Sequence, residues 1–252
     1  MRVFDSDRKL RVVVFFSGGA SGLRYLADND PNYGEKYEVV GAFTDSPGCP
    51  GTEFARDRGI EVKANDLEEF YSKRGADTRD LDVREEYDKR TRDEIAEFEA
   101  DLIMLSGYMR ILTPPIVEEY PIINVHPADL TIEDQDGERV YTGFDPVHDA
   151  VTEGEAYTRS SVHFVTQEVD EGPLLVLSRP FEVHRPLVDD LMKNDAEEGV
   201  QEYVDAHQEW MKWEGDGPAF AKALELIADR RVGIKNSKVY IDGEEGHYVM
   251  EN

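Results

Sequence analysis

The chain has 252 residues, and its 28 Lys and Arg against 55 Asp and Glu give a formal net charge of −27. So acidic a chain is poorly suited to neutralising nucleic-acid phosphates, and we expect no nucleic-acid partner. No apolar run is long enough to cross a bilayer, so we expect no membrane partner either. An apolar fraction of 40% in periodic segments predicts a sizeable core and argues against disorder.

The cysteine count and the first residues indicate the compartment. Cys49 is the only cysteine, which excludes an internal disulfide framework, and the first ten residues contain no apolar signal-peptide core. These features predict a cytoplasmic protein. The acidic excess is spread along the chain, so it indicates either a solvated surface or a halophilic protein. Because salt screens charge repulsion, the second interpretation predicts a salt requirement for stability.

Apolar runs alternate with amphipathic segments along the chain. This order predicts an α/β fold with a mostly parallel twisted sheet flanked by helices, with a C-terminal helix and hairpin. Strands are expected at residues 11–16, 39–44, 102–105, 122–125 and 161–166, with a sixth at 174–177 and 181–183. Helices are expected at residues 23–27, 52–58, 81–100 and 218–230, and a terminal hairpin returns through residues 242–243.

The segments between these elements suggest a single domain over residues 1–252. Residues 1–10 form an N-terminal extension, residues 131–142 an inserted loop, and residues 184–252 a C-terminal helical segment and hairpin. The polar stretch 131–139 and the acidic stretch 189–199 are expected to be insertions without regular structure.

A glycine-rich turn, residues 17–22, follows the first expected strand and opens a helix. Backbone N–H groups at such a turn, together with the helix dipole, can bind an anion. The turn lacks the Lys-Ser/Thr of a P-loop, and Ala20 occupies the second glycine position of the dinucleotide-binding pattern. A tight strand-to-helix turn without a ligand is an equal alternative.

Asn124 and His126 stand at the carboxyl end of the fourth expected strand. Their two-residue spacing places both on one face, about 6–7 Å apart along the strand. Ligands of open α/β sheets bind at this edge, where an amide and an imidazole can stabilise an oxyanion and move a proton. Alternatively, both side chains only cap the following loop.

Asp170 precedes a Gly-Pro turn and is of interest only if it meets His126, because a carboxylate fixes the tautomer of an imidazole. We interpret the other histidines, including His163, as structural or solvated. No cluster of His, Cys and carboxylates has metal-ligand spacing, so no metal is expected. No G-x-S-x-G element supports serine hydrolase chemistry.

Six segments in register resemble the folate-dependent formyltransferases, most closely the branch that acts on glycinamide ribonucleotide. They are residues 15–23, 83–88, 105–112, 123–127, 161–165 and 169–173. The resemblance implies a Rossmann-like formyltransferase fold. It also implies that 10-formyltetrahydrofolate donates a formyl group to the amine of glycinamide ribonucleotide in purine biosynthesis. The sequence leaves open whether the protein is a monomer or a homodimer.

The same resemblance implies a role for each matching residue. The residues implied in catalysis are Asn124, His126 and Asp170, with protonated His126 and Asn124 stabilising the oxyanion. The residues implied in folate binding are Met109, Arg110, Ile111, Leu112, Val169, Glu171 and Gly172. The residues implied in acceptor binding, around its phosphate, are Gly18, Gly19, Ala20, Ser21, Gly22 and Arg84; either Glu209 or Glu214 is a further contact.

The sequence departs from the family pattern at the phosphate turn and after the histidine. Ala20 and Gly22 replace a glycine and an asparagine, and a polar extension separates Leu130 from Tyr141. These changes leave other functions open: formyl transfer to another amine such as an amino-sugar nucleotide, deformylation of 10-formyltetrahydrofolate by water, or folate or nucleotide binding without turnover. Methionyl-tRNA formyl transfer is disfavoured by the charge and by the absence of a C-terminal barrel pattern.

Overall fold

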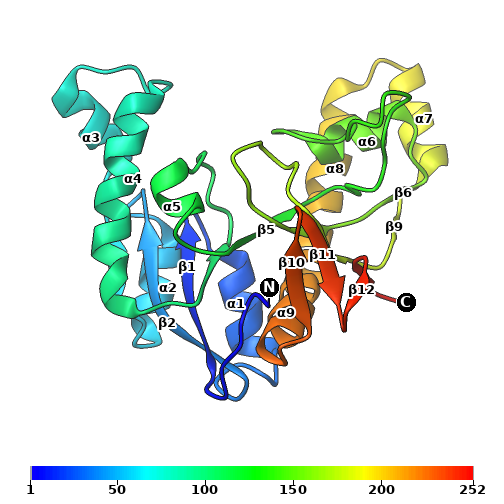
Figure 1. Ribbon diagram of the computed structural model, residues 1–252. Helices are drawn as coiled ribbons and strands as arrows, with labels where there is room; N and C mark the ends of the chain where they lie inside the picture. The colour runs from blue at the N-terminus through cyan, green and yellow to red at the C-terminus, as the bar shows by residue number, and fades with distance from the viewer. Residues whose placement is uncertain (1, 252) are drawn as a thin grey trace.

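An eight-stranded sheet organises the computed structural model, which describes residues 2–251 (Figure 1). Its strands are β1 (Leu10–Phe16), β2 (Tyr37–Thr44), β3 (Val62–Ala64), β4 (Leu102–Leu105), β5 (Ile122–His126), β7 (Ser161–Phe164), β8 (Leu174–Leu177) and β13 (Tyr248–Val249). Their order is β13-β8-β7-β5-β4-β1-β2-β3. β7 runs antiparallel to β5 and β8, whereas the other neighbours in the sheet pair in parallel. The predicted mostly parallel α/β fold is confirmed.

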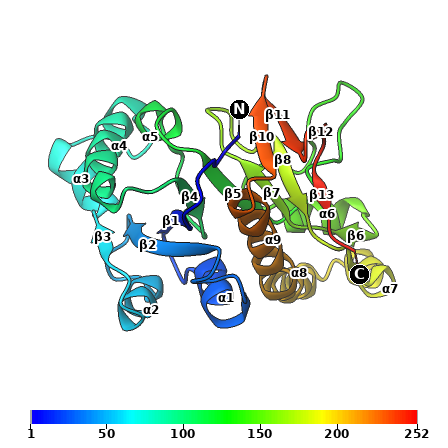
Figure 2. The ribbon, with the colours of Figure 1, turned by 60° about the horizontal axis from the view of Figure 1, so that its bottom comes forward.

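Helices cover both faces of this sheet (Figure 2). They are α1 (Ser21–Asn29), α2 (Pro50–Asp57), α3 (Leu67–Arg74), α4 (Leu81–Ile95), α5 (Pro114–Val117), α6 (Pro146–Glu153), α7 (Arg185–Lys193), α8 (Glu197–Met211) and α9 (Gly217–Ala228). A 3₁₀ turn, η1 (Ala96–Phe98), follows α4, and a π-helical segment, η2 (Lys212–Asp216), joins α8 to α9.

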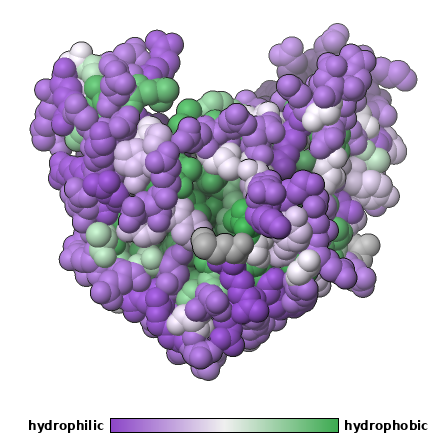
Figure 3. Space-filling view, in the orientation of Figure 1, coloured by the Kyte–Doolittle hydropathy of each residue, from purple (hydrophilic) through white to green (hydrophobic). Residues whose placement is uncertain are grey.

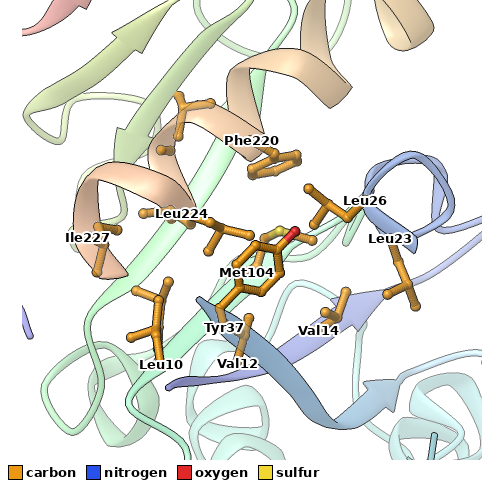
Figure 4. Packing of buried hydrophobic residues seen from close by; sticks show 14 of the residues in the cluster. Leu10, Val12, Val14, Leu23, Leu26, Tyr37, Met104, Phe220, Leu224 and Ile227 are labelled. Atoms are coloured by element: carbon orange, nitrogen blue, oxygen red, sulfur yellow. The ribbon is translucent and has the colours of Figure 1, made fainter. Parts of the chain in front are cut away.

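The sequence of β1 explains its position inside the sheet, between β4 and β2. Because strand residues alternate between faces, Val12 and Val14 pack with α1 and α9, as Figure 4 shows. Val13 and Phe15 point to the other face and pack in a second cluster with side chains of α3, α4 and α5. β1 is therefore buried on both sides, as its uninterrupted apolar sequence predicts.

The other elements form smaller structures around the sheet. They are a two-stranded sheet of β6 (Tyr157–Thr158) and β9 (Phe181–Glu182), and a three-stranded sheet of β10 (Val232–Lys235), β11 (Lys238–Ile241) and β12 (Glu244–Glu245). α3 and α4 form one arm of the molecule and α6, α7 and α8 the other, and the outline is notched between them (Figures 1 and 3).

The structure corrects the expectation that residues 189–199 lack regular structure, because 189–193 belong to α7 and 197–199 to α8, with a three-residue turn between them. α7 buries Val188, α8 buries Val200, Val204, His207 and Met211, and both helices leave their acidic residues in solvent. The two helices pack closely, since a Cβ on Gly199 would lie 2.8 Å from Leu191. Acidic residues outnumber apolar ones in residues 189–199, which explains why periodicity alone missed the two helices.

Several predicted boundaries also differ. The helix expected at 81–100 ends as an α-helix at Ile95, and the strand expected at 161–166 ends at Phe164. Residues 181–183 do not extend the sixth strand, because Phe181–Glu182 pairs with β6 in a separate sheet. Pro180 lies between the two segments and has no N–H to donate to a ladder. Residues 131–142 contain no helix or strand, as expected.

Candidate active site

A cavity of about 260 Å³ lies where β4 and β5 end and where residues 165–173 connect β7 to β8. The predicted site residues that line it are Met109, Arg110, Ile111, Leu112, Asn124, His126, Val169 and Asp170. Glu171 and Gly172 belong to the same turn but do not line the cavity. The structure therefore brings the implied catalytic residues together with most of the implied folate-binding residues.

Strand register places the polar groups at one point of the sheet. Asn124 of β5 pairs with His163 of β7, and His126 pairs with Ser161. The Asn124 amide nitrogen lies 3.4 Å from Nε2 of His163. His163, interpreted from the sequence as structural or solvated, is buried and also lines the cavity. Its antiparallel pairing with Asn124, which the sequence did not reveal, brings it into the site.

Both ring nitrogens of His126 have defined neighbours. Nε2 lies 2.7 Å from the carbonyl oxygen of Tyr141, and Nδ1 lies 3.4 Å from Oδ2 of Asp170. Because a carbonyl only accepts hydrogen bonds, Nε2 carries a proton and Nδ1 is the basic nitrogen of the neutral ring. A proton taken up at Nδ1 is stabilised by the facing carboxylate.

Asp170 is held on three sides. Its Oδ1 lies 3.5 Å from Nε2 of His163, its Oδ2 faces His126, and the backbone N–H of Gly143 donates to Oδ2 at 3.2 Å. Burial would raise the pKa of this carboxyl, but the neighbouring imidazoles and the Gly143 amide outweigh burial and lower its pKa. Asp170 is therefore ionised at neutral pH.

Burial has the opposite consequence for His126. Removal of the ring from water lowers the pKa of His126, and the negative charge of Asp170 offsets only part of this effect. The resting imidazole is consequently neutral at neutral pH. Such a ring is suited to receive a proton during a reaction.

The segment after β4 forms one wall of the cavity. Met109 and Ile111 have 60% and 52% of their surface exposed, although both are apolar. Nε of Arg110 donates to the buried carboxylate of Asp45 at 2.6 Å, which ties this segment to the end of β2. Val169 on the facing turn is 53% exposed. The cavity thus has apolar walls and a polar floor.

The glycine-rich turn lies beside this cavity without lining it. Ser17 connects the two, because its N–H donates to Gly107 and its hydroxyl accepts from the N–H of Met109. Ala20 has a left-handed backbone with φ 52°, a conformation in which glycine is the usual residue. A Cβ on Gly22 would lie 3.0 Å from the Phe220 ring and from the Ser106 hydroxyl, so the space for a larger side chain is filled.

Arg84 does not meet this turn. It is buried on α4, its guanidinium lies 5.5 Å and 5.7 Å from the ring centroids of Tyr71 and Tyr87, and it acts electrostatically on Asp88 and Tyr108. α4 covers the face of the sheet opposite to α1, which begins at the glycine-rich turn. The implied contact of Arg84 with the acceptor phosphate is therefore not supported by its position.

The two candidate glutamates near the C-terminal helices differ in surroundings. Glu209 accepts hydrogen bonds from Lys212 and from the indole of Trp213, both at 2.9 Å. Glu214 lies in η2, which contacts α1, and acts electrostatically on Tyr25 of α1. Glu214 is thus the glutamate on the side of the glycine-rich turn. Within residues 2–251 no three His, Cys, Asp or Glu side chains are placed to hold a metal, and no helix could span a membrane.

The chain is similar in sequence and in fold to several known proteins. The phosphoribosylglycinamide formyltransferase of Escherichia coli is 25% identical to the chain, over 93% of this chain and 95% of its own length. The chloroplastic phosphoribosylglycinamide formyltransferase of Arabidopsis thaliana is 29% identical, over 83% of this chain and 70% of its own length. The Coxiella burnetii phosphoribosylglycinamide formyltransferase structure superposes with a TM-score of 0.71 at 22% identity, covering 97% of this chain and 100% of that one. A Pseudomonas putida formyltetrahydrofolate deformylase has a TM-score of 0.66 at 18% identity, covering 94% and 71%. The pattern of the Formyl transferase family matches residues 10–206, so the chain is an enzyme of that family.

Proposed function

We propose that the protein transfers a formyl group from 10-formyltetrahydrofolate to the amine of glycinamide ribonucleotide, a step of purine biosynthesis. The observation that carries this proposal is the convergence of Asn124, His126 and Asp170 in one cavity of a Formyl transferase family member. The relatives named as phosphoribosylglycinamide formyltransferases support this choice of acceptor.

The cavity walls suit the folate donor. Met109, Ile111 and Val169 expose apolar surface that a flat heteroaromatic ring would cover, and covering it is favourable. Leu112 is buried behind them and supports the wall. Residues 109–112, Val169 and Asp170 line the cavity, and their backbone groups are the proposed hydrogen-bond partners of such a ring. No metal ion is required by this chemistry.

The reaction follows from the two polar side chains of β5. The acceptor amine attacks the formyl carbon, and the Asn124 amide N–H donates to the carbonyl oxygen as it gains negative charge. Nδ1 of neutral His126 takes the proton that the amine loses, and Asp170 stabilises the resulting imidazolium. His126 then returns this proton to the departing folate nitrogen, which completes the transfer without net proton change.

The glycine-rich turn is the proposed subsite for the acceptor phosphate. Gly18, Gly19, Ala20, Ser21 and Gly22 offer backbone N–H groups at the start of α1, together with the Ser21 hydroxyl. Gly22 contributes no side chain, so main-chain groups have the larger share of phosphate recognition. Glu214 is the proposed partner of the acceptor hydroxyls from the η2 side.

A deformylase is the second candidate, since the Pseudomonas putida structure has a similar fold and water could replace the amine. Transfer to another amine, such as an amino-sugar nucleotide, is the third candidate, because the phosphate turn departs from the family pattern. We further propose a halophilic, cytoplasmic enzyme that acts as a monomer or homodimer.

One assay separates these candidates. The protein in 2 M KCl is mixed with 10-formyltetrahydrofolate, with and without glycinamide ribonucleotide, and the tetrahydrofolate product is followed by absorbance. Turnover that requires glycinamide ribonucleotide supports the proposal. Turnover in its absence identifies a deformylase. Folate binding without turnover in either mixture contradicts the proposed acceptor and favours another amine.

A further inference from the structure

The inserted segment, residues 131–142, reaches the candidate active site through Arg139. Nη1 of Arg139 donates to the carbonyl oxygen of Gly172 at 3.0 Å and also to that of Asp170. Arg139 is half-buried, whereas the residues just before it, 133–138, are exposed. One guanidinium thus bonds to two carbonyls of the turn that carries Asp170.

That turn has little to hold it in place by itself. Asp170 has φ 57°, a left-handed conformation that costs an ordinary residue about 1–2 kcal/mol. The chain then passes so close to β7 that a Cβ on Gly172 would lie 1.6 Å from the Phe164 carbonyl oxygen. The turn's own hydrogen bonds both go to the Glu168 carbonyl, one from the Thr166 hydroxyl at 3.1 Å and one from the Glu171 N–H at 3.5 Å. External support from Arg139 therefore falls on the residue of this turn that has a left-handed backbone, Asp170, and on Gly172.

The inserted segment is itself anchored, so Arg139 has a fixed base. Val140 N–H donates to the Ile132 carbonyl at 3.1 Å, and Ile132 packs against the small cluster that contains Tyr141. The Tyr141 hydroxyl donates to Glu155 at 3.0 Å, and its carbonyl faces His126. Gly143, just after the segment, donates its N–H to Asp170. The segment consequently contacts both His126 and Asp170.

We propose that Arg139 is a positioning residue that fixes the Asp170 carboxylate against His126 by holding the carbonyls of Asp170 and Gly172. If a peptide unit rotates at this turn, the Asp170 side chain moves with it. A small displacement of a catalytic group can lower the reaction rate many-fold. The inference rests on the proposed function for its kinetic consequence, but the geometric claim does not depend on which substrate is used.

The geometric claim is tested by hydrogen exchange on the ligand-free protein. Arg139→Ala should speed exchange of the amides of residues 167–172 and of Gly143, whose N–H reports on the Asp170 carboxylate. Glu138→Ala is the matched control, since this exposed neighbour has no side-chain contact within the described residues. Unchanged exchange at these amides in Arg139→Ala overturns the proposal, whether or not the protein is a formyltransferase.

The kinetic consequence is tested by a double-mutant cycle. Arg139→Ala should lower kcat about 10- to 100-fold and leave the KM for glycinamide ribonucleotide unchanged, with partial recovery in Arg139→Lys. If Arg139 acts through Asp170, Arg139→Ala should lower kcat much less in the Asp170→Asn background than in the wild type. Equal losses in both backgrounds overturn the proposed route. If the wild type has no transferase activity but exchange changes as expected, the proposed function fails and the positioning role stands.

Discussion

Nδ1 of His126 lies 3.4 Å from Oδ2 of Asp170, while Nε2 of the same ring is hydrogen-bonded to the Tyr141 carbonyl at 2.7 Å. The imidazole therefore has one nitrogen committed as a donor and one that faces a negative charge. Burial keeps the resting ring neutral, and the facing carboxylate makes the protonated ring attainable. This arrangement gives His126 both states that a proton shuttle needs.

The first prediction concerns pH. A neutral His126 is required to accept the amine proton, and its pKa lies below the ordinary 6.5, so the acidic limb of kcat/KM should lie below pH 6.5. Asp170→Asn removes the charge that raises the pKa of His126, so the limb should move to still lower pH. The rate should fall about 10²–10⁴-fold. Profiles between pH 5 and 8 test this; a limb that moves upward in Asp170→Asn contradicts it.

The second prediction concerns His163. Its Nδ1 lies 3.1 Å from the Phe164 carbonyl, while Nε2 faces Asn124 and Asp170. His163→Asn should lower kcat about tenfold because both neighbours lose a fixed partner. His207, which is buried and bonded to the Thr158 hydroxyl away from the cavity, is a matched control. His207→Asn should lower the melting temperature without changing kcat. Equal losses of kcat in the two variants would contradict a specific contribution of His163 to the reaction.

The third prediction concerns the glycine-rich turn. Gly22→Ala should destabilise the fold by about 1–3 kcal/mol because its Cβ meets Phe220 and Ser106 at 3.0 Å. Phe220→Leu opens the same space. Gly22→Ala should therefore destabilise the Phe220→Leu variant less than it destabilises the wild type. Denaturant unfolding of the four proteins measures this coupling. Additive losses would show that Phe220 does not set the size limit at residue 22.

The fourth prediction concerns Asp216, which is 8% exposed, with Oδ1 lacking a hydrogen-bond partner. Burial raises its pKa to about 6, above the value of the unfolded chain. Between about pH 4 and 6 this carboxyl is protonated in the folded state but ionised in the unfolded state. The free energy of unfolding therefore falls as the pH rises through that range.

Asp216→Asn removes that penalty. It should raise the free energy of unfolding more at pH 8 than at pH 5, with a difference of about 1 kcal/mol. Unfolding at both pH values measures the effect, and exposed Asp205→Asn is the control. An equal gain at both pH values would show that ionisation of Asp216 is not the cause.

The fifth prediction concerns salt. The net charge of −27 makes the folded state self-repelling in dilute buffer, and molar KCl screens that repulsion. The melting temperature should therefore be higher in 2 M KCl than in 50 mM KCl. Substituting several exposed acidic residues by their amides should reduce the difference. Equal melting temperatures in the two buffers would contradict a halophilic protein.

The large sheet could be predicted because its strands are continuous apolar runs; residues 102–105 and 174–177 were predicted with the boundaries that β4 and β8 have. α7 and α8 were missed because acidic residues outnumber apolar ones in residues 189–199, although apolar side chains of both helices pack in one buried cluster. In the site, the two-residue spacing of Asn124 and His126 could be read directly. The participation of His163 and Arg139 depends on antiparallel pairing and on a loop path, which no local pattern encodes.

The most direct test of the proposed function measures the rate of formyl transfer from 10-formyltetrahydrofolate to glycinamide ribonucleotide by the wild type and by His126→Ala. The proposed mechanism predicts acceptor-dependent turnover by the wild type and a kcat at least about 10²-fold lower in the variant, with unchanged folding by circular dichroism. Near-normal transfer by folded His126→Ala would contradict the assignment of this cavity as the site of formyl transfer.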